Sequence, residues 1–169
     1  MARSLLVAAL VSFAASGYAA LLGCPTGFTV NGTAKVHDGG GAPVLTAAGA
    51  CQYLDPPNNS TVADEANVNA AGFFSTSTWT MVGDKVDLPD GVGQTGTWTI
   101  AGAEFAAFDY MIVFKDGKGT NLIAFLLNEL FSSGGWNSPF ENPPFVVLGP
   151  GVTKDVSHYA IFQSDDAQR

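Results

Sequence analysis

The chain has 169 residues, a formal net charge of −8 and seven Lys and Arg residues in all. This length fits one domain, and a domain of roughly 150 residues buries about two-thirds of its unfolded surface, so it can fold without a metal or a dense disulfide framework. The scarcity of cations argues against nucleic acid and anionic membranes as partners, because both need clustered Lys and Arg.

Residues 1–20 have the features of a secretory signal peptide. A positive start at Arg3 precedes an apolar run, Leu5 to Ala15, and small residues follow up to Ala19 and Ala20. A transmembrane anchor is the alternative, but polar residues interrupt the run, and it is shorter than the roughly 20 residues of a span. We expect cleavage after Ala19 or Ala20 and a secreted protein, associated with the cell surface, with no membrane span in the mature chain.

Cys24 and Cys51 are the two cysteines of the chain. An even count in an exported protein favours a disulfide between them, and closing a loop of about 27 residues contributes roughly 3 kcal/mol. The alternative is lipidation, because Leu-Leu-Gly-Cys at residues 21–24 partly matches a bacterial lipobox, in which the cysteine becomes the acylated first residue.

The composition predicts an all-β fold for residues 21–163. The chain contains 20 Gly, only 13 % of its residues are charged, and strand and turn formers dominate it. We therefore expect one antiparallel, jelly-roll-like β-sandwich with at most one short helix, followed by a flexible tail at 164–169.

The expected elements follow in chain order. Short strands are predicted at Phe28–Val30, Ala34–Val36 and Gln52–Leu54, a helical turn or two within Val62–Phe74, and strands at Thr76–Val82 and Thr95–Ile100. The tryptophans of the last two, Trp79 and Trp98, are expected in the core on facing strands.

The clearest strand is Phe108–Lys115, which alternates over eight residues. Its predicted buried face holds Phe108, Tyr110, Ile112 and Phe114, and its opposite face holds Asp109, Met111, Val113 and Lys115. Asn121–Leu127 suits a helix or a strand, and the hairpin-type residues 116–119 before it favour the strand. We expect a loop around Trp136 at Gly134–Pro144 and a last strand at Val156–Phe162.

Several segments, in this order, resemble the ectodomain of PEP-CTERM proteins, the exosortase-sorted class of bacterial exported proteins. They are Gly-Phe-Thr-Val-Asn-Gly at 27–32, Gly-Thr-Trp-Thr-Ile at 96–100, Phe-Asp-Tyr at 108–110, Ser-Gly-Gly-Trp at 133–136 and Val-Ser-His-Tyr-Ala-Ile-Phe at 156–162.

The resemblance implies an exported surface or matrix component of bacteria that make exopolysaccharide, and it supplies no catalytic residues. Members usually continue into a Pro-Glu-Pro signal, an apolar span and a basic tail. This sequence ends at Arg169 without them. We therefore expect either a version that lacks the sorting tail or a tail-less relative.

Residues that could support catalysis are few, and we predict no enzyme. His158 lies next to Ser157, but neighbouring strand residues point to opposite faces, which speaks against a Ser-His pair. The spacing of the acids selects no glycosidase pair; those considered were Glu104, Asp109, Glu129 and Glu141.

Two weaker candidate sites remain. Asp84, Asp87 and Asp90 could bind Ca²⁺, although an acidic turn explains them as well, and no other cofactor is expected. Trp136 is either a core plug or a glycan-stacking platform.

We therefore predict a non-catalytic surface or biofilm-matrix protein that contacts extracellular polysaccharide, other surface proteins or further copies of itself. The alternatives are a carbohydrate-binding module on extracellular polysaccharide and a subunit of an extracellular fibre.

Overall fold

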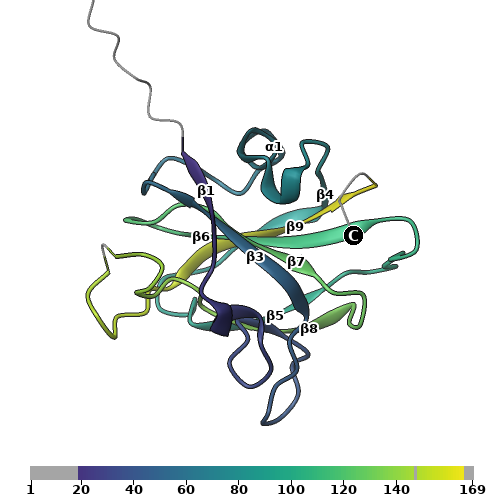
Figure 1. Ribbon diagram of the computed structural model, residues 1–169, viewed down its shortest axis with the longest axis horizontal. Coiled ribbons are helices and arrows are strands. Elements are labelled where there is room, and N and C mark those ends of the chain that lie inside the picture. Colours follow the sequence, from purple (N-terminus) through teal and green to yellow (C-terminus); the bar gives the residue numbers. More distant parts are fainter. Residues whose placement is uncertain (1–18, 147, 166–169) are drawn as a thin grey trace, which may run out of the picture.

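The computed structural model describes residues 19–146 and 148–165. Within these residues, strands and a few short helices form the fold (Figure 1). The strands are β1 (Ala20–Gly23), β2 (Val36–His37), β3 (Ala48–Asp55), β4 (Thr80–Asp87), β5 (Thr95–Thr99), β6 (Asp109–Asp116), β7 (Ile123–Leu127), β8 (Ser133–Asn137) and β9 (Val156–Ser164). The helices are α1 (Glu65–Ala71) and the 3-10 helices η1 (Thr26–Thr29) and η2 (Phe73–Ser75).

The strands form two antiparallel sheets, as the composition predicted. The larger sheet has the order β1-β3-β7-β6-β9-β4, and the smaller has the order β2-β8-β5. In Figure 1, β5 and β8 lie on one side of the larger sheet and α1 lies on the other. The all-β sandwich with one short α-helix is therefore confirmed, and α1 adds a partial third layer.

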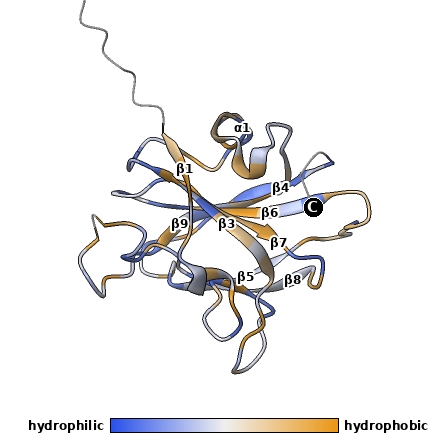
Figure 2. Cartoon of the chain, in the orientation of Figure 1, coloured by the Kyte–Doolittle hydropathy of each residue, from blue (hydrophilic) through white to orange (hydrophobic). Residues whose placement is uncertain are grey.

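The centre of the larger sheet is buried on both faces. In β6, Ile112 and Phe114 pack toward the smaller sheet, whereas Met111 and Val113 pack into a second cluster with α1 and η2. Figure 2 shows that β7, beside β6, is hydrophobic along its length. The predicted apolar face is confirmed for Tyr110, Ile112 and Phe114, whereas Phe108 precedes β6 and is only partly buried. The face predicted to oppose it is buried as well.

Helix α1 occupies the middle of the stretch predicted to be helical. Asp64 caps its N-terminus by accepting a hydrogen bond of 2.8 Å from the Asn67 backbone N–H. The helix ends at Gly72, which has a φ of 68° that suits glycine. Val68, which is fully buried, points from the helix into the second cluster.

The two segments around Trp79 and Trp98, each of sequence Thr-Trp-Thr, do not face one another. Trp98 belongs to the cluster between the sheets, whereas Trp79 packs with Phe74 in the cluster under α1. The six-stranded sheet therefore separates the two indoles, and the expectation of facing strands is wrong. Strand β4 also begins at Thr80, after Trp79, rather than at Thr76.

The prediction of a loop at Gly134–Pro144 is wrong for the first residues of that segment. They belong to β8, the central strand of the smaller sheet. Trp136 lies opposite Gly96 of β5, and Trp98 lies opposite Gly134. A Cβ atom on Gly96 would lie 2.3 Å from the Trp136 ring, so the glycine makes room for the indole. The glycines of this sheet permit close packing rather than a turn.

The N-terminal region also differs from the prediction. Phe28 was expected in a strand, but it lies in the 3-10 helix η1 and is buried against Phe125 of β7. Strand β3 is longer than predicted, and β2 is a two-residue strand that pairs with β8. Pro25, directly before η1, is the residue at which the extended chain turns into the helix.

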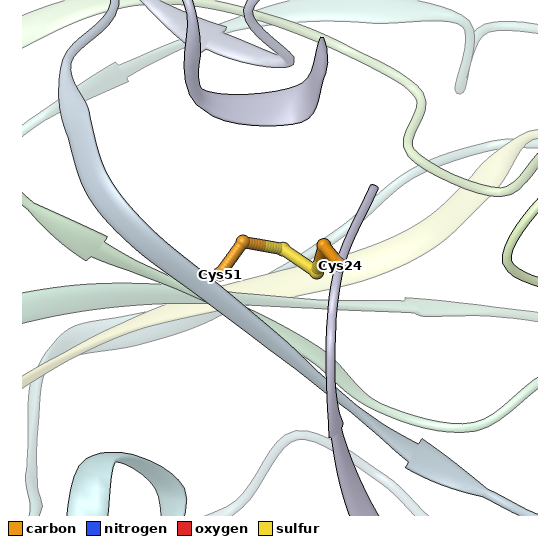
Figure 3. The surroundings of a disulfide bond; sticks show 2 residues. All are labelled: Cys24 and Cys51. Atoms are coloured by element: carbon orange, nitrogen blue, oxygen red, sulfur yellow. A yellow bond between two sulfur atoms is a disulfide. The ribbon is translucent and has the colours of Figure 1, made fainter. Parts of the chain in front are cut away.

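A disulfide joins Cys24 to Cys51, as the cysteine count predicted (Figure 3). Cys24 follows β1 directly, and Cys51 lies in the middle of β3, with 5.4 Å between their Cα atoms. A sulfur in a disulfide cannot also carry a lipid, so this structure does not contain the lipidated form of Cys24.

The sheets extend slightly beyond the predicted domain of residues 21–163. Strand β1 begins at Ala20, and β9 ends at Ser164. Nearly all of the predicted leader, residues 1–18, and most of the tail, residues 166–169, lie outside the described residues. No helix of the described residues is long and apolar enough to cross a membrane.

We predict that Trp136→Ala lowers the free energy of unfolding by about 3–5 kcal/mol, because it removes a large ring from the tightly packed core. Chemical denaturation followed by far-UV circular dichroism measures the loss. Thr97→Ala on the exposed face of β5 is the matched control and should change stability by about 0.5 kcal/mol or less. Equal stability of the two variants would contradict the core role of Trp136.

We predict that replacing both cysteines by serine lowers the free energy of unfolding by about 2–4 kcal/mol, because the unfolded chain regains its loop entropy. Mass spectrometry after alkylation should detect two free thiols in the native protein only after reduction. A native mass that matches a diacylglyceryl group on Cys24 would contradict the disulfide.

Candidate functional site

A pocket of about 260 Å³ lies where η1, the start of β2 and the segment after β8 meet. Its lining combines prolines with a charged pair: Pro25, Gly27, Phe28, Thr33, Lys35, Glu141 and Pro143. It is therefore a largely apolar pocket with an ammonium and a carboxylate in its wall.

The charged pair joins two segments that are distant in the sequence. Lys35 Nζ lies 2.6 Å from Glu141 Oε2 and 5.2 Å from the centroid of the Phe28 ring. The Lys35 side chain is 15 % exposed and that of Glu141 33 %, so solvent screens the pair only in part. A ligand in the pocket can still reach both groups.

The backbone fixes the position of both charges. The Lys35 N–H donates to Phe28 O at 3.0 Å, and the Asn137 N–H at the end of β8 donates to Lys35 O at 2.9 Å. Glu141 begins a turn in which its carbonyl accepts from the Phe145 N–H. Because the disulfide holds Cys24 beside β3, the pocket wall at Pro25 is tied to the larger sheet.

The groups that line this pocket are suited to binding a ligand through hydrogen bonds and apolar contacts. Lys35 supplies hydrogen-bond donors, Glu141 supplies acceptors, and the proline rings supply apolar walls. Sequence reasoning placed Glu141 only among scattered acids and did not select Lys35. The pair is 106 positions apart in the sequence, and no motif connects the two residues.

The Ser157–His158 pair requires a correction. A bulge in β9 opposite Lys115 and Asp116 brings Ser157 Oγ to 3.1 Å from His158 Nδ1, so the expectation that the two side chains diverge is wrong. His158 Nε2 accepts the Ala63 N–H at 3.1 Å, and the ring proton is therefore on Nδ1 and faces Ser157. Ser157 in turn donates to Lys115 O at 3.0 Å. With its proton toward the serine, this imidazole cannot act as the general base for Ser157.

Lys115, predicted on the face opposite the core, is almost fully buried. Its Nζ donates to Asp116 Oδ1 and to Thr120 O, each at 3.0 Å, and Lys154 Nζ lies 3.5 Å from Asp116 Oδ2. Burial lowers the pKa of Lys115, and the hydrogen bond to Asp116 opposes that shift. This cluster lies at the end of β6, and its charged groups pair with one another.

Trp136 is not a glycan platform. The ring is 1 % exposed and packs 5.5 Å from Phe114 and 5.9 Å from Tyr159, measured between ring centroids. Its Nε1 is buried without a hydrogen-bond partner in the described part of the chain. The core-plug alternative is the one that the structure bears out.

The three aspartates considered for Ca²⁺ are exposed on β4 and the turn after it. Asp87 pairs with Lys85 at 2.5 Å, and the hydrogen bond from Lys85 lowers the pKa of Asp87. Asp84 and Asp90 do not join it: residues 19–146 and 148–165 contain no group of three or more His, Cys, Asp or Glu side chains placed to hold a metal ion.

Comparison of the chain with protein-family models, curated proteins and solved structures found no match. The resemblance to PEP-CTERM ectodomains therefore stays a prediction from sequence, and the site is interpreted from its own geometry.

We predict that stability falls as the pH drops below about 6.5. Burial is the main cause that lowers the pKa of His158 below its usual 6.5, with Lys85 and Lys115 adding to the effect and Asp87 and Asp64 opposing it. As the pH falls, His158 therefore takes up a proton in the unfolded chain at a higher pH than in the folded protein. Protonation of this residue consequently favours unfolding. Urea unfolding at several pH values measures the slope.

His158→Gln should reduce this slope, because glutamine does not titrate and can still accept the Ala63 N–H. The pKa of His37 is also lowered by burial, which Asp38 opposes, so His37→Gln should remove a separate part of the slope. Unchanged pH dependence in the His158 variant would contradict the assignment.

Proposed function

We propose that this chain is an exported, non-catalytic protein of the bacterial cell surface or extracellular matrix. The observation that carries the proposal is the Cys24–Cys51 disulfide, which lies only a few residues after the predicted leader. Disulfides persist in oxidising compartments outside the cytoplasm, and the leader is the route to such a compartment.

Two further features support this proposal. The PEP-CTERM resemblance implies a surface or matrix role in bacteria that make exopolysaccharide. The net charge of −8 keeps such a protein soluble and favours neutral partners over anionic ones. The partners we propose are extracellular polysaccharide and other surface proteins.

A carbohydrate-binding module is the second candidate function, and the pocket at Lys35 and Glu141 favours it. Small-ligand sites combine apolar walls with a few convergent polar groups, and this pocket does so with its two prolines and its ion pair. A protein with this function would bind the matrix through individual sugar units.

A fibre joined edge to edge has less support. The edge strand β4 carries Asp84, Lys85 and Asp87, and a bulge interrupts its pairing with β9 between Val82 and Val86. Charges and bulges on edge strands hinder pairing with another sheet. The opposite edge strand, β1, offers only four residues.

We predict that the full chain, expressed with a C-terminal tag in a polysaccharide-producing bacterium, is recovered from the surface or matrix fraction without its leader. Cell fractionation and intact mass measure both properties. Leu10→Arg, which breaks the apolar run of the leader, is the control and should stay inside the cell. Wild-type protein that stays in the cytoplasm, or leaves the cell without surface association, would contradict the proposal.

A further inference from the structure

We propose that the pocket at Lys35 and Glu141 binds one neutral sugar unit of an extracellular polysaccharide through two adjacent hydroxyl groups. This inference rests on the second candidate function and names its binding site and ligand class. The site differs from Trp136, the only glycan contact that the sequence suggested.

The size of the pocket selects a single unit. Its volume of about 260 Å³ is slightly below the roughly 300–1,000 Å³ of pockets for drug-sized ligands. Gly27 and Thr33 at its margin are exposed, so the rest of a longer chain can continue into solvent. The pocket therefore suits one unit of a polymer, held from one side.

The polar groups of the pocket match a pair of neighbouring hydroxyls. An ammonium and a carboxylate whose nitrogen and oxygen lie 2.6 Å apart present donors next to acceptors. A hydroxyl both donates and accepts, so one hydroxyl can accept from Lys35 while its neighbour donates to Glu141. Hydrogen bonds to charged groups are stronger than those between neutral groups, so a lost contact to either group should weaken binding measurably.

The apolar walls match the C–H face of a sugar ring. Pro25 and Pro143 line the pocket with aliphatic rings that have no N–H to satisfy. The Phe28 ring is 3 % exposed and lies under the Lys35 ammonium, so it supports the lysine rather than stacking on the ligand.

The charges indicate a neutral ligand. Glu141 balances the positive charge of Lys35 inside the pocket, and the chain as a whole carries a net charge of −8. A uronate or sulfate group would approach against this field and would compete with Glu141 for the lysine. A neutral hexose leaves the ion pair intact.

The test is isothermal titration of the purified, oxidised protein with neutral gluco-, manno- and galacto-oligosaccharides and with uronate oligosaccharides. We expect at least one neutral series to bind and the uronates to bind at least about tenfold more weakly. Preference for the uronates, or binding of a proline-rich peptide but no sugar, would overturn the proposal.

Two pairs of variants locate the binding. Gly27→Leu should fill the pocket, because a Cβ there meets only Thr33 Oγ1, at an ordinary 3.6 Å, and affinity should fall at least about tenfold. Gly41→Leu, at a loop glycine with no atom within 4 Å of its Cβ position, should bind like wild type. Normal binding by the Gly27 variant would overturn the site.

The second pair tests the charges. Lys35→Met keeps the aliphatic stem but removes the donor, and affinity should fall about tenfold or more. Lys85→Met removes the lysine of another ion pair, which does not line the pocket, and should leave binding unchanged. Thermal unfolding of each variant shows whether it is folded, and the Gly27 pair decides the outcome if the Lys35 variant is unfolded.

Failure of this inference differs from failure of the proposed function. A protein that is found in the matrix fraction but binds no oligosaccharide overturns the sugar site and leaves the surface role standing. A protein that binds neutral sugar through this pocket but stays in the cytoplasm supports the site and overturns the export proposal.

Discussion

The fold depends on burying both faces of the central strands β6, β7 and β9. Each large apolar side chain there gains about 1.5–3 kcal/mol from burial, but only if another layer covers it. The smaller sheet covers one face, and α1 with η2 covers the other. The short elements are thus held mainly by the sheet that they cover, since a seven-residue helix has little stability of its own.

Patterns of local origin were predictable from the sequence. The alternation in β6 identified the strand and one of its two buried faces, and the turn residues before β7 distinguished a strand from a helix. The stretch Val62–Phe74, in which a helical turn or two was predicted, contains α1. These features depend on neighbouring residues, so the sequence carries their signal directly.

Features that depend on distant contacts were not predictable. Ser-Gly-Gly-Trp has the composition of a turn, yet it forms the central strand β8 because its glycines admit the packing of neighbouring chain segments. The β9 bulge that turns Ser157 toward His158 leaves no pattern in the residues. Lys115 looks like a surface residue until Asp116 and Thr120 O are found beside its ammonium.

The same holds for the pocket. Its charged residues become neighbours only when the segment after β8 folds back across η1, a contact that joins positions 35 and 141. The cysteine count predicted the disulfide but not its relation to the pocket. The structure shows that it fixes Cys24, and therefore the neighbouring Pro25, which lines the pocket. A prediction from residue types can find candidates, but it cannot place them together.

The pairing of Gly96 with Trp136 and of Trp98 with Gly134 has a consequence for how this sequence can diverge. Each indole occupies volume on the side of the sheet where the opposite residue has no side chain. A larger residue at position 96 is tolerated only if position 136 becomes smaller. Position 134 is restricted in a different way, because a Cβ atom on Gly134 would first meet the backbone carbonyl of His37, which a smaller residue at position 98 does not remove. Descendants of this chain should therefore change positions 96 and 136 together, so covariation between these two positions would identify this small sheet in relatives too distant to resemble the chain elsewhere.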